Sequence, residues 1–171
     1  QAKGGSLREA LDQWLARAAG RAAIDFGFHV CIADLRPDVE AEMASLVSDG
    51  VTSFKLFMAY PDRLMLNDDG IACVLRRAAD IGGLVCLHAE NGPVIETLVR
   101  EALAVGHTVP VYHARTRPPL VEAEAVQRGI ELAERAGAPL YVVHLSCALG
   151  LDRIAAARER GLGVLAETCP Q

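Results

Sequence analysis

The stretch Thr52-Ser-Phe-Lys-Leu-Phe-Met58 decides the fold class of this 171-residue chain. Apolar side chains surround its one lysine, and the stretch follows a turn signal at Gly50. A short, nearly continuous apolar run of this kind predicts a strand that is buried on both faces, as in a parallel sheet. The pattern recurs in four other short runs, which are residues 24–32, 84–89, 140–145 and 162–166.

Helical patterns separate these runs. Apolar residues recur at helical spacing between them, and charged residues fill the remaining positions. Capping signals support the pattern: Ser6-Leu-Arg-Glu9 predicts a capping box, Asn91-Gly-Pro93 predicts a helix start, and a glycine follows each helical segment. We therefore expect an α/β fold with about five parallel strands and six helices.

Two architectures fit this alternation, a doubly wound sheet and a (β/α)8 barrel. Neither GxGxxG nor GxxxxGK[S/T] follows any strand-like run, so the doubly wound sheets that bind phosphate in this way lose support. A complete (β/α)8 barrel needs roughly 250 residues, so the chain would be a partial TIM-like barrel that lacks about three strands. We expect residues 1–171 to form a single segment of such a barrel.

The connection HTVPVYHARTRPP, residues 107–119, joins two helical segments without an intervening strand. Loops of this length in compact domains are usually functional or interfacial, but a plain surface excursion fits equally well. We expect its two histidines, His107 and His113, to be surface or interface groups.

The composition excludes several classes of function. Hydrophobic residues make up 51% and charged residues 23%, a globular balance, and the formal net charge of -5 argues against a nucleic-acid partner. There is no apolar run of about 18 residues to span a membrane, and no secretion signal is visible. The five cysteines form no CxxC pair, so we expect reduced thiols and a cytoplasmic location.

Lys55 is the least expected residue in the chain, because it lies inside a run that is apolar on both sides. A strand that is buried on both faces cannot hold a charged ammonium group without a large desolvation penalty. Lys55 must therefore pair with a carboxylate, lose its proton or be chemically modified, for example to a carbamate that binds metal. On residue type alone, the ion-paired lysine is the favoured interpretation.

Two histidines end strand-like runs: His88 ends Leu84-Val-Cys-Leu-His88, and His144 ends Leu140-Tyr-Val-Val-His144. Active sites of parallel α/β folds lie at the carboxyl ends of the strands, and neutral imidazole is the commonest zinc ligand. A single such histidine is more often a hydrogen-bonded core residue. Two of them, together with Lys55 on a third strand, favour a metal site.

Four other residues carry less specific signals. His29 lies within the first strand-like run, where packing or a supporting hydrogen bond is favoured over metal ligation. Tyr60 follows the strand of Lys55, and its phenol is either a hydrogen-bond donor to an oxyanion or an interfacial aromatic. Ser146 and Cys147 follow His144, but no GxSxG nucleophile motif is present, so covalent catalysis is a weak alternative.

Five motifs occur in one order along the chain: FKLFMAY at 54–60, HAEN at 88–91, HARTRPP at 113–119 with EAE at 122–124, HLS at 144–146, and ETCPQ at 167–171. Each motif is weak by itself, whereas the ordered set is highly specific. In this set the chain resembles the dihydropyrimidinases and hydantoinases of the amidohydrolase superfamily, over essentially its whole length.

The resemblance implies a (β/α)8 barrel with a separate β-rich domain and two zinc ions per complete subunit. Lys55 would be an N6-carboxylysine that bridges the two ions, and His88 and His144 would bind the second ion. A bridging hydroxide would open the cyclic amide of a dihydropyrimidine or 5-substituted hydantoin to an N-carbamoyl amino acid, while Tyr60 polarises the carbonyl. Family members are cytoplasmic homotetramers, so we expect a homo-oligomeric enzyme with a small cyclic amide or ureide substrate.

The chain also departs from the pattern of the family. It lacks the HxH pair of the first strand, the late-strand aspartate and the β-rich domain. We therefore interpret it as an internal piece of a longer family member that is inactive by itself. A catalytic zinc ion needs three protein ligands, so Lys55, His88 and His144 would hold one ion or none. The open edges of a partial sheet predict association with other chains.

Two alternatives fit the same resemblance. One is a non-catalytic dihydropyrimidinase-like assembly protein of the collapsin response mediator type, whose members lack the metal ligands that this chain retains. The other is an allantoinase or dihydroorotase, which opens a different ring. The continuation Phe57-Met-Ala-Tyr60 favours the dihydropyrimidinase branch.

Overall fold

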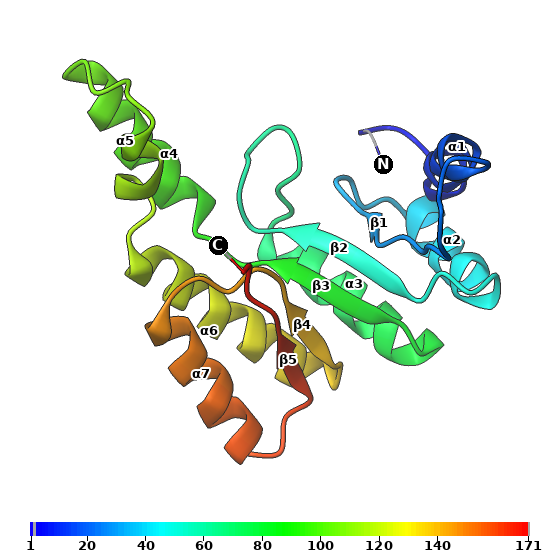
Figure 1. The fold of residues 1–171 in the computed structure, drawn as a ribbon. Coiled ribbons are helices and arrows are strands. Elements are labelled where there is room, and N and C mark those ends of the chain that lie inside the picture. Colours follow the sequence, from blue (N-terminus) through cyan, green and yellow to red (C-terminus); the bar gives the residue numbers. More distant parts are fainter. Residues whose placement is uncertain (2, 171) are drawn as a thin grey trace.

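The computed structural model describes residue 1 and residues 3–170, and their centre is one sheet of five parallel strands (Figure 1). The spatial order of the strands follows the chain, β1-β2-β3-β4-β5. A doubly wound sheet reverses its strand order at a switch point, whereas a (β/α)8 barrel does not. The partial barrel is therefore the correct alternative. The strands are β1 (Val30–Cys31), β2 (Ser53–Phe57), β3 (Leu84–His88), β4 (Leu140–Val142) and β5 (Val164–Ala166).

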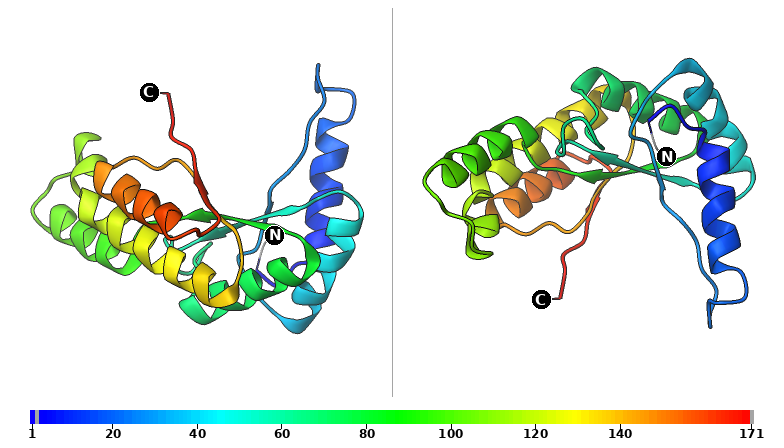
Figure 2. Two further views of the ribbon diagram at one scale, coloured as in Figure 1. Left: turned by 90° about the horizontal axis from the view of Figure 1, so that it is seen from below. Right: turned by 90° about the horizontal axis from the view of Figure 1, so that it is seen from above.

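Seven helices occur in the described part of the chain, and Figure 2 shows α3 and α6 on the same side of the sheet. Six correspond to the predicted segments. The seventh, α5, was missed because one and a half turns between prolines show no periodicity. The helices are α1 (Leu7–Ala18), α2 (Pro37–Ser48), α3 (Asp68–Ile81), α4 (Gly92–Ala104), α5 (Val111–Arg115), α6 (Pro119–Ala136) and α7 (Ala148–Glu159).

The two faces of the sheet differ in what covers them. On β2, Phe54 and Leu56 are fully buried in the hydrophobic core beneath the helices. Lys55 and Phe57 alternate with them and point to the opposite face, which the helices leave open. In the register of β2 with β3, Lys55 lies beside Cys86 and Phe57 beside His88. Lys55 and His88 therefore share the open face, with His88 nearer the carboxyl end.

The prediction of a strand over residues 24–32 was largely wrong, because β1 covers only Val30–Cys31. β1 is an edge strand that pairs with β2 alone, and Val30 lies opposite Phe54, the second residue of β2. Residues before Val30 therefore run past the end of their partner strand, and Ile24 is 83% exposed. Apolar side chains cannot keep an edge strand extended where no neighbouring strand supplies hydrogen bonds.

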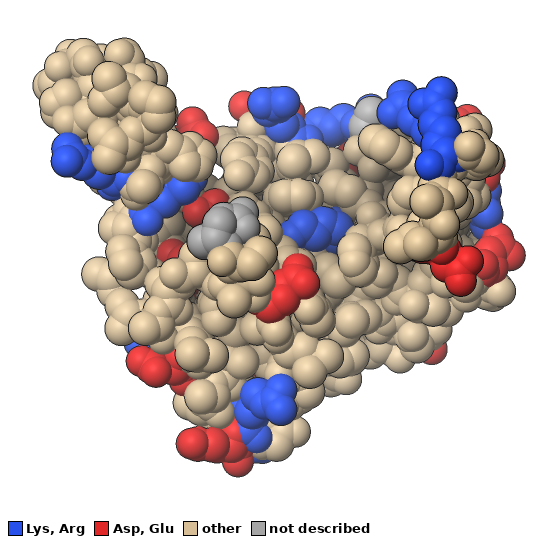
Figure 3. Space-filling view, in the orientation of Figure 1, with Lys and Arg blue, Asp and Glu red and all other residues tan. Residues whose placement is uncertain are grey.

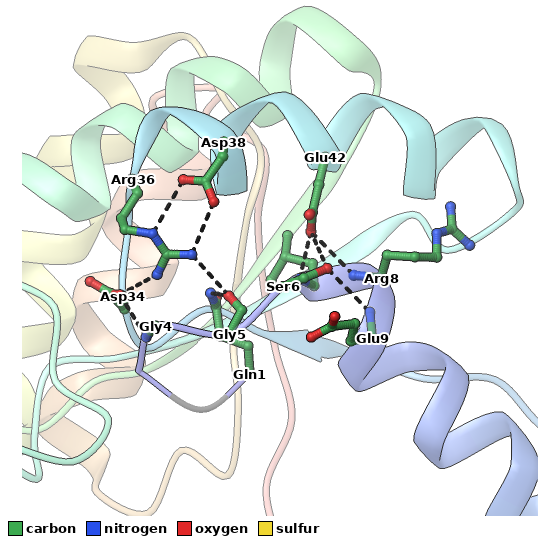
Figure 4. Close-up of polar contacts among 11 residues, drawn as sticks. Gln1, Gly4, Gly5, Ser6, Arg8, Glu9, Asp34, Arg36, Asp38 and Glu42 are labelled. Atoms are coloured by element: carbon green, nitrogen blue, oxygen red, sulfur yellow. Dashed lines mark hydrogen bonds and ion pairs between the residues drawn. The ribbon is translucent and has the colours of Figure 1, made fainter.

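The N-terminal segment is attached to α2 by polar contacts (Figure 4). The carboxylate of Glu42 accepts hydrogen bonds from the backbone N–H groups of Leu7 and Arg8 at 2.6 and 3.2 Å. The hydroxyl of Ser6 accepts from the N–H of Glu9, as the capping box predicts. Arg36 bridges this region by donating to Asp34, to Asp38 and to the carbonyl of Gly5. We call residues 4–9, 34–38 and 42 the N-terminal corner.

An arm formed by α4 and α5 projects from the other end of the molecule (Figure 1). Residues 102–114, at its tip, include no Lys, Arg, Asp or Glu, and Figure 3 shows the basic side chains gathered at its foot. Among the described residues, no helix is both long and apolar enough to cross a membrane.

Candidate metal centre

The carboxyl ends of β3 and β4 bring His88 and His144 into direct contact. His88 is the last residue of β3 and only 6% exposed, and His144 follows the end of β4 by two residues. The Nδ1 atom of His88 lies 3.0 Å from the Nε2 atom of His144. The prediction that these two side chains share one site is consistent with this geometry.

Glu90 fixes the orientation of the His88 ring. The Nε2 atom of His88 lies 2.7 Å from a carboxylate oxygen of Glu90, and hydrogen bonding to His88 holds the pKa of Glu90 below its ordinary value. An ionised carboxylate can only accept, so Nε2 of His88 carries the proton and donates it. In a neutral His88, the lone pair of Nδ1 then faces Nε2 of His144.

His144 occupies an unusual backbone conformation, with a φ of 41°. Such left-handed values are uncommon for residues other than glycine and persist only where surrounding contacts enforce them. Burial lowers the pKa of the His144 imidazole, and the neighbouring His88 lowers it further. Both effects favour the neutral ring, which is the form that binds a metal ion.

Lys55 lies on the same face, one row deeper in the sheet. Its Nζ atom is buried and has no hydrogen-bond partner in the described structure, and it lies 4.8 Å from the centre of the Phe57 ring. Burial lowers the pKa of Lys55 to about 8, against the attraction of Cys86, Cys31 and Glu167. The ion-paired interpretation of Lys55 was therefore wrong. What remains is a desolvated amine that loses its proton easily.

Tyr60 lies beside the histidine pair, also with a left-handed backbone, at a φ of 66°. The centre of its ring is 5.3 Å from that of His88. Tyr60, His88 and His144 all line a cavity of about 400 Å³. The same cavity is lined by Glu90, His113, Arg117, Pro119, Glu122, Ser146 and Cys147.

The connection of residues 107–119 thus contributes to the site as well as to the surface. His113 is exposed, as predicted for a surface group, and it also lines the cavity. His107 stacks on Tyr112 in the arm, with ring centres 4.1 Å apart. Arg117, at the end of the connection, lies 3.7 Å from Glu90, so this part of the connection lies at the candidate site.

Two residues of the cavity were missed as site residues, although both lie in the quoted motifs. Glu90 belongs to HAEN, and Glu122 begins EAE. The spacing of Glu90, two residues after a histidine at a strand end, could have suggested a carboxylate that orients the imidazole. The role of Glu122 depends on tertiary contacts that no spacing reveals.

His29 lies just before β1 and not within a strand. Its Nδ1 atom is 2.7 Å from the hydroxyl of Ser53, so a hydrogen bond is what the structure shows for it. Ser146 hydrogen-bonds to the carbonyl of His144 through its hydroxyl, and Cys147 caps α7 through its sulfur. Neither arrangement presents a nucleophile activated by a base. Gln171, the last residue of the ETCPQ motif, lies outside the described residues.

Three groups of the described structure fit a metal ion, and they come from three neighbouring strands. Two are the facing nitrogens of His88 and His144, and the third is the buried amine of Lys55. In the described part of the chain, no set of three His, Cys, Asp or Glu residues is arranged to hold a metal ion.

Comparison with known proteins gives consistent relatives, although no family model matches the chain. A D-hydantoinase from Streptomyces coelicolor is 51% identical over 171 residues, which is 100% of this chain and 37% of that protein. A D-hydantoinase from Geobacillus stearothermophilus is 48% identical and covers 99% of this chain and 36% of its own length.

Solved structures agree with these sequences. A crystal structure of a dihydropyrimidinase from Brevibacillus agri superimposes with a TM-score of 0.98 at 49% identity, over 100% of this chain and 37% of that one. A D-hydantoinase crystal structure gives the same TM-score at 46% identity and the same coverage. The chain thus spans little more than a third of the length of the relatives that it matches, and over that span it is similar in sequence and fold to D-hydantoinases and dihydropyrimidinases.

Proposed function

We propose that the protein is a metal-dependent cyclic amidohydrolase that opens dihydropyrimidines or 5-substituted hydantoins to N-carbamoyl amino acids. The observation that carries this proposal is the facing pair His88 and His144 beside the unpartnered Lys55. The names of the relatives, D-hydantoinase and dihydropyrimidinase, supply the substrate class.

The histidine pair fits a zinc ion. Two imidazole nitrogens on one tetrahedral zinc ion lie roughly 3.3 Å apart, given Zn–N bonds of about 2.0–2.1 Å. The corresponding nitrogens of His88 and His144 are 3.0 Å apart, so a small outward shift would accommodate the ion. Glu90 supports this role, because a carboxylate on the far nitrogen orients a metal-binding imidazole and raises its basicity.

Lys55 fits the role of a carbamate ligand. Its neutral amine can attack carbon dioxide and release one proton, which leaves an anionic N-carboxy group on Nζ. A pKa of about 8 makes this neutral form accessible near neutral pH. The carbamate would place oxygen donors on the face that His88 and His144 share, and a carboxylate with two oxygens can bridge two metal ions.

The chemistry divides between the metal ions and the protein. When bound, zinc supplies a Lewis acid and lowers the pKa of a water molecule to near neutrality. Tyr60 would donate a hydrogen bond to the substrate carbonyl as negative charge develops on its oxygen. The cavity of about 400 Å³ has room for a small ring. The proposal includes two zinc ions per subunit, a cytoplasmic homotetramer, and residues 1–171 as one segment of the barrel.

Replacing Lys55 tests the proposal directly. In the zinc-loaded full-length protein, Lys55→Ala should abolish binuclear metal binding and the hydrolysis of dihydrouracil and hydantoin, because the bridging donor is removed, whereas residues 1–171 alone should be inactive on dihydrouracil. Lys3→Ala is the matched control, since Lys3 is the only other lysine and is exposed. Zinc content is measured by elemental mass spectrometry and ring opening by ultraviolet absorbance. Two zinc ions per chain in Lys55→Ala would contradict the assignment, and so would undiminished turnover.

A further inference from the structure

Glu122 makes a contact that the proposed reaction does not explain. It lies in the first turn of α6, and both of its carboxylate oxygens accept the backbone N–H of Ser146, at 2.9 and 3.1 Å. Ser146 lies two residues after His144, in the loop between β4 and α7. A charged acceptor on a backbone N–H is among the stronger hydrogen bonds in proteins.

The loop that Glu122 holds is the one that carries His144 in its left-handed conformation. Other contacts fix the same loop from the sheet side: the N–H of Val143 donates to the carbonyl of Leu87, and that of Leu145 donates to the carbonyl of Glu167. From the helix side, Glu122 holds Ser146, and the thiol of Cys147 donates to the carbonyl of Pro119 at the start of α6. Without Glu122, the Ser146 N–H would lose its partner, and the backbone of His144 could relax toward an ordinary conformation.

We propose that Glu122 is a positioning residue that sets the ring of His144 for metal binding through the backbone of Ser146. The metal-binding role of this contact rests on the proposed function, whereas the contact itself holds the loop in the metal-free protein. Glu122 lines the same cavity as both histidines, so the contact belongs to the site and not to a distant part of the fold.

A neighbouring residue of the helix provides the control. Glu131 lies on α6 as well, but its carboxylate accepts from the side chain of Gln127 on the same helix. Replacing Glu131 removes a carboxylate from α6 without touching the loop after β4. The conservative variant Glu122→Gln keeps one oxygen that can accept from the Ser146 N–H, but it loses the charge.

Amide hydrogen exchange in the metal-free protein is the first measurement. Glu122→Ala should accelerate exchange at Ser146 about 10- to 100-fold, because its N–H loses its acceptor, while Glu131→Ala leaves it unchanged. Glu122→Gln should fall between Glu122→Ala and the wild type. Thermal unfolding of each variant checks that the fold is retained.

Zinc titration by calorimetry is the second measurement. Glu122→Ala should weaken zinc binding about 10- to 100-fold, the usual effect of removing a group that orients a ligand. Wild-type exchange at Ser146 in Glu122→Ala would overturn the inference, and so would wild-type zinc affinity. These titrations use the full-length protein: if its wild type binds no zinc, the proposed function fails, whereas the exchange result still decides whether Glu122 positions the loop.

Discussion

In two regions of the molecule, a glutamate on a helix accepts hydrogen bonds from the backbone N–H groups of another segment, with different consequences. In the N-terminal corner, Glu42 of α2 binds backbone N–H groups at the start of α1, and Arg36 donates a hydrogen bond to the carbonyl of Gly5 just before this helix. At the carboxyl edge of the sheet, Glu122 of α6 binds a backbone N–H in the loop of His144. The first contact attaches one helix to another, whereas the second sets a side chain that lines the cavity.

The comparison separates contacts that stabilise the fold from contacts that set the geometry of the site. In the N-terminal corner, Glu42 binds Leu7 and Arg8 in the ordinary helical conformation of α1, so losing this contact should lower stability and little else. At the carboxyl edge, Tyr60 and His144 both have positive φ values, and these conformations depend on their surroundings. Loss of a contact there should change the geometry of the site more than the stability of the protein.

A pair of glycine substitutions gives the largest contrast. A Cβ atom on Gly92, at the start of α4, would lie 2.8 Å from the Cα atom of Ala59 and 2.9 Å from the carbonyl oxygen of Met58. Both are backbone atoms next to Tyr60 and cannot move aside separately. In the full-length protein, Gly92→Ala should therefore displace Tyr60 and lower kcat/KM for hydantoin roughly 100-fold, as displacements of about 1 Å do.

Gly129→Ala is the counterpart in the body of the fold. Its Cβ would lie 2.6 Å from a methyl group of Leu87, at the end of a flexible side chain beneath the sheet. Overpacking there should cost about 1–3 kcal/mol in the free energy of unfolding and leave kcat/KM unchanged. Urea denaturation and steady-state kinetics measure both variants. If Gly92→Ala kept wild-type kinetics, the contrast between the two regions would fail.

The sequence predicted the body of the fold better than its edges. Strands such as Ser53–Phe57 and Leu84–His88 follow from apolar runs alone, although the expected burial of both faces was wrong for Ser53–Phe57, where buried and partly buried residues alternate. The strand over residues 24–32 failed because pairing with a neighbour, and not composition, decides where an edge strand ends. The short helix α5 failed because five residues are too few to show a period.

For the site, the sequence predicted residue types but not their partners. His88 and His144 were identified by their place at strand ends, and the structure brings them together. The favoured ion pair of Lys55 was wrong, because no carboxylate of the described structure reaches its Nζ atom. The sequence alone gives no sign of this. Glu122 acts through the backbone of a residue 24 positions away, and such a contact leaves no local pattern.

Removing Glu42 tests the N-terminal corner. Glu42→Ala leaves the N–H groups of Leu7 and Arg8 without their charged acceptor, so the free energy of unfolding should fall by about 1.5–3 kcal/mol. Zinc affinity and exchange at Ser146 should stay at their wild-type values, in contrast to Glu122→Ala. Urea denaturation and zinc titration give the two readouts. A loss of zinc affinity in Glu42→Ala would mean that the two regions are coupled.

The smallest expected effect is the loss of folding free energy that results from burying the charged form of Lys55. Its pKa is about 8 in the folded protein and 10.5 when unperturbed, so the unfolded chain binds more protons between these values. The wild type should therefore gain stability as pH rises from about 8 toward 10.5, and the charged amine should oppose folding below pH 8.

Lys55→Met, which fills the same space without charge, should accordingly stabilise the metal-free protein at pH 7. Because Lys55 is only partly buried, solvent screening should keep the gain below about 1 kcal/mol. The gain should shrink between pH 7 and pH 9.5, as measured by urea denaturation in buffers with a chelator and without carbon dioxide. A gain that stays constant over this range would assign it to methionine packing instead of to the removal of charge. A gain in stability that disappears with rising pH would show that the charged form of Lys55 destabilises the folded protein. Its presence at this edge of the sheet would then serve the site and not the stability of the fold.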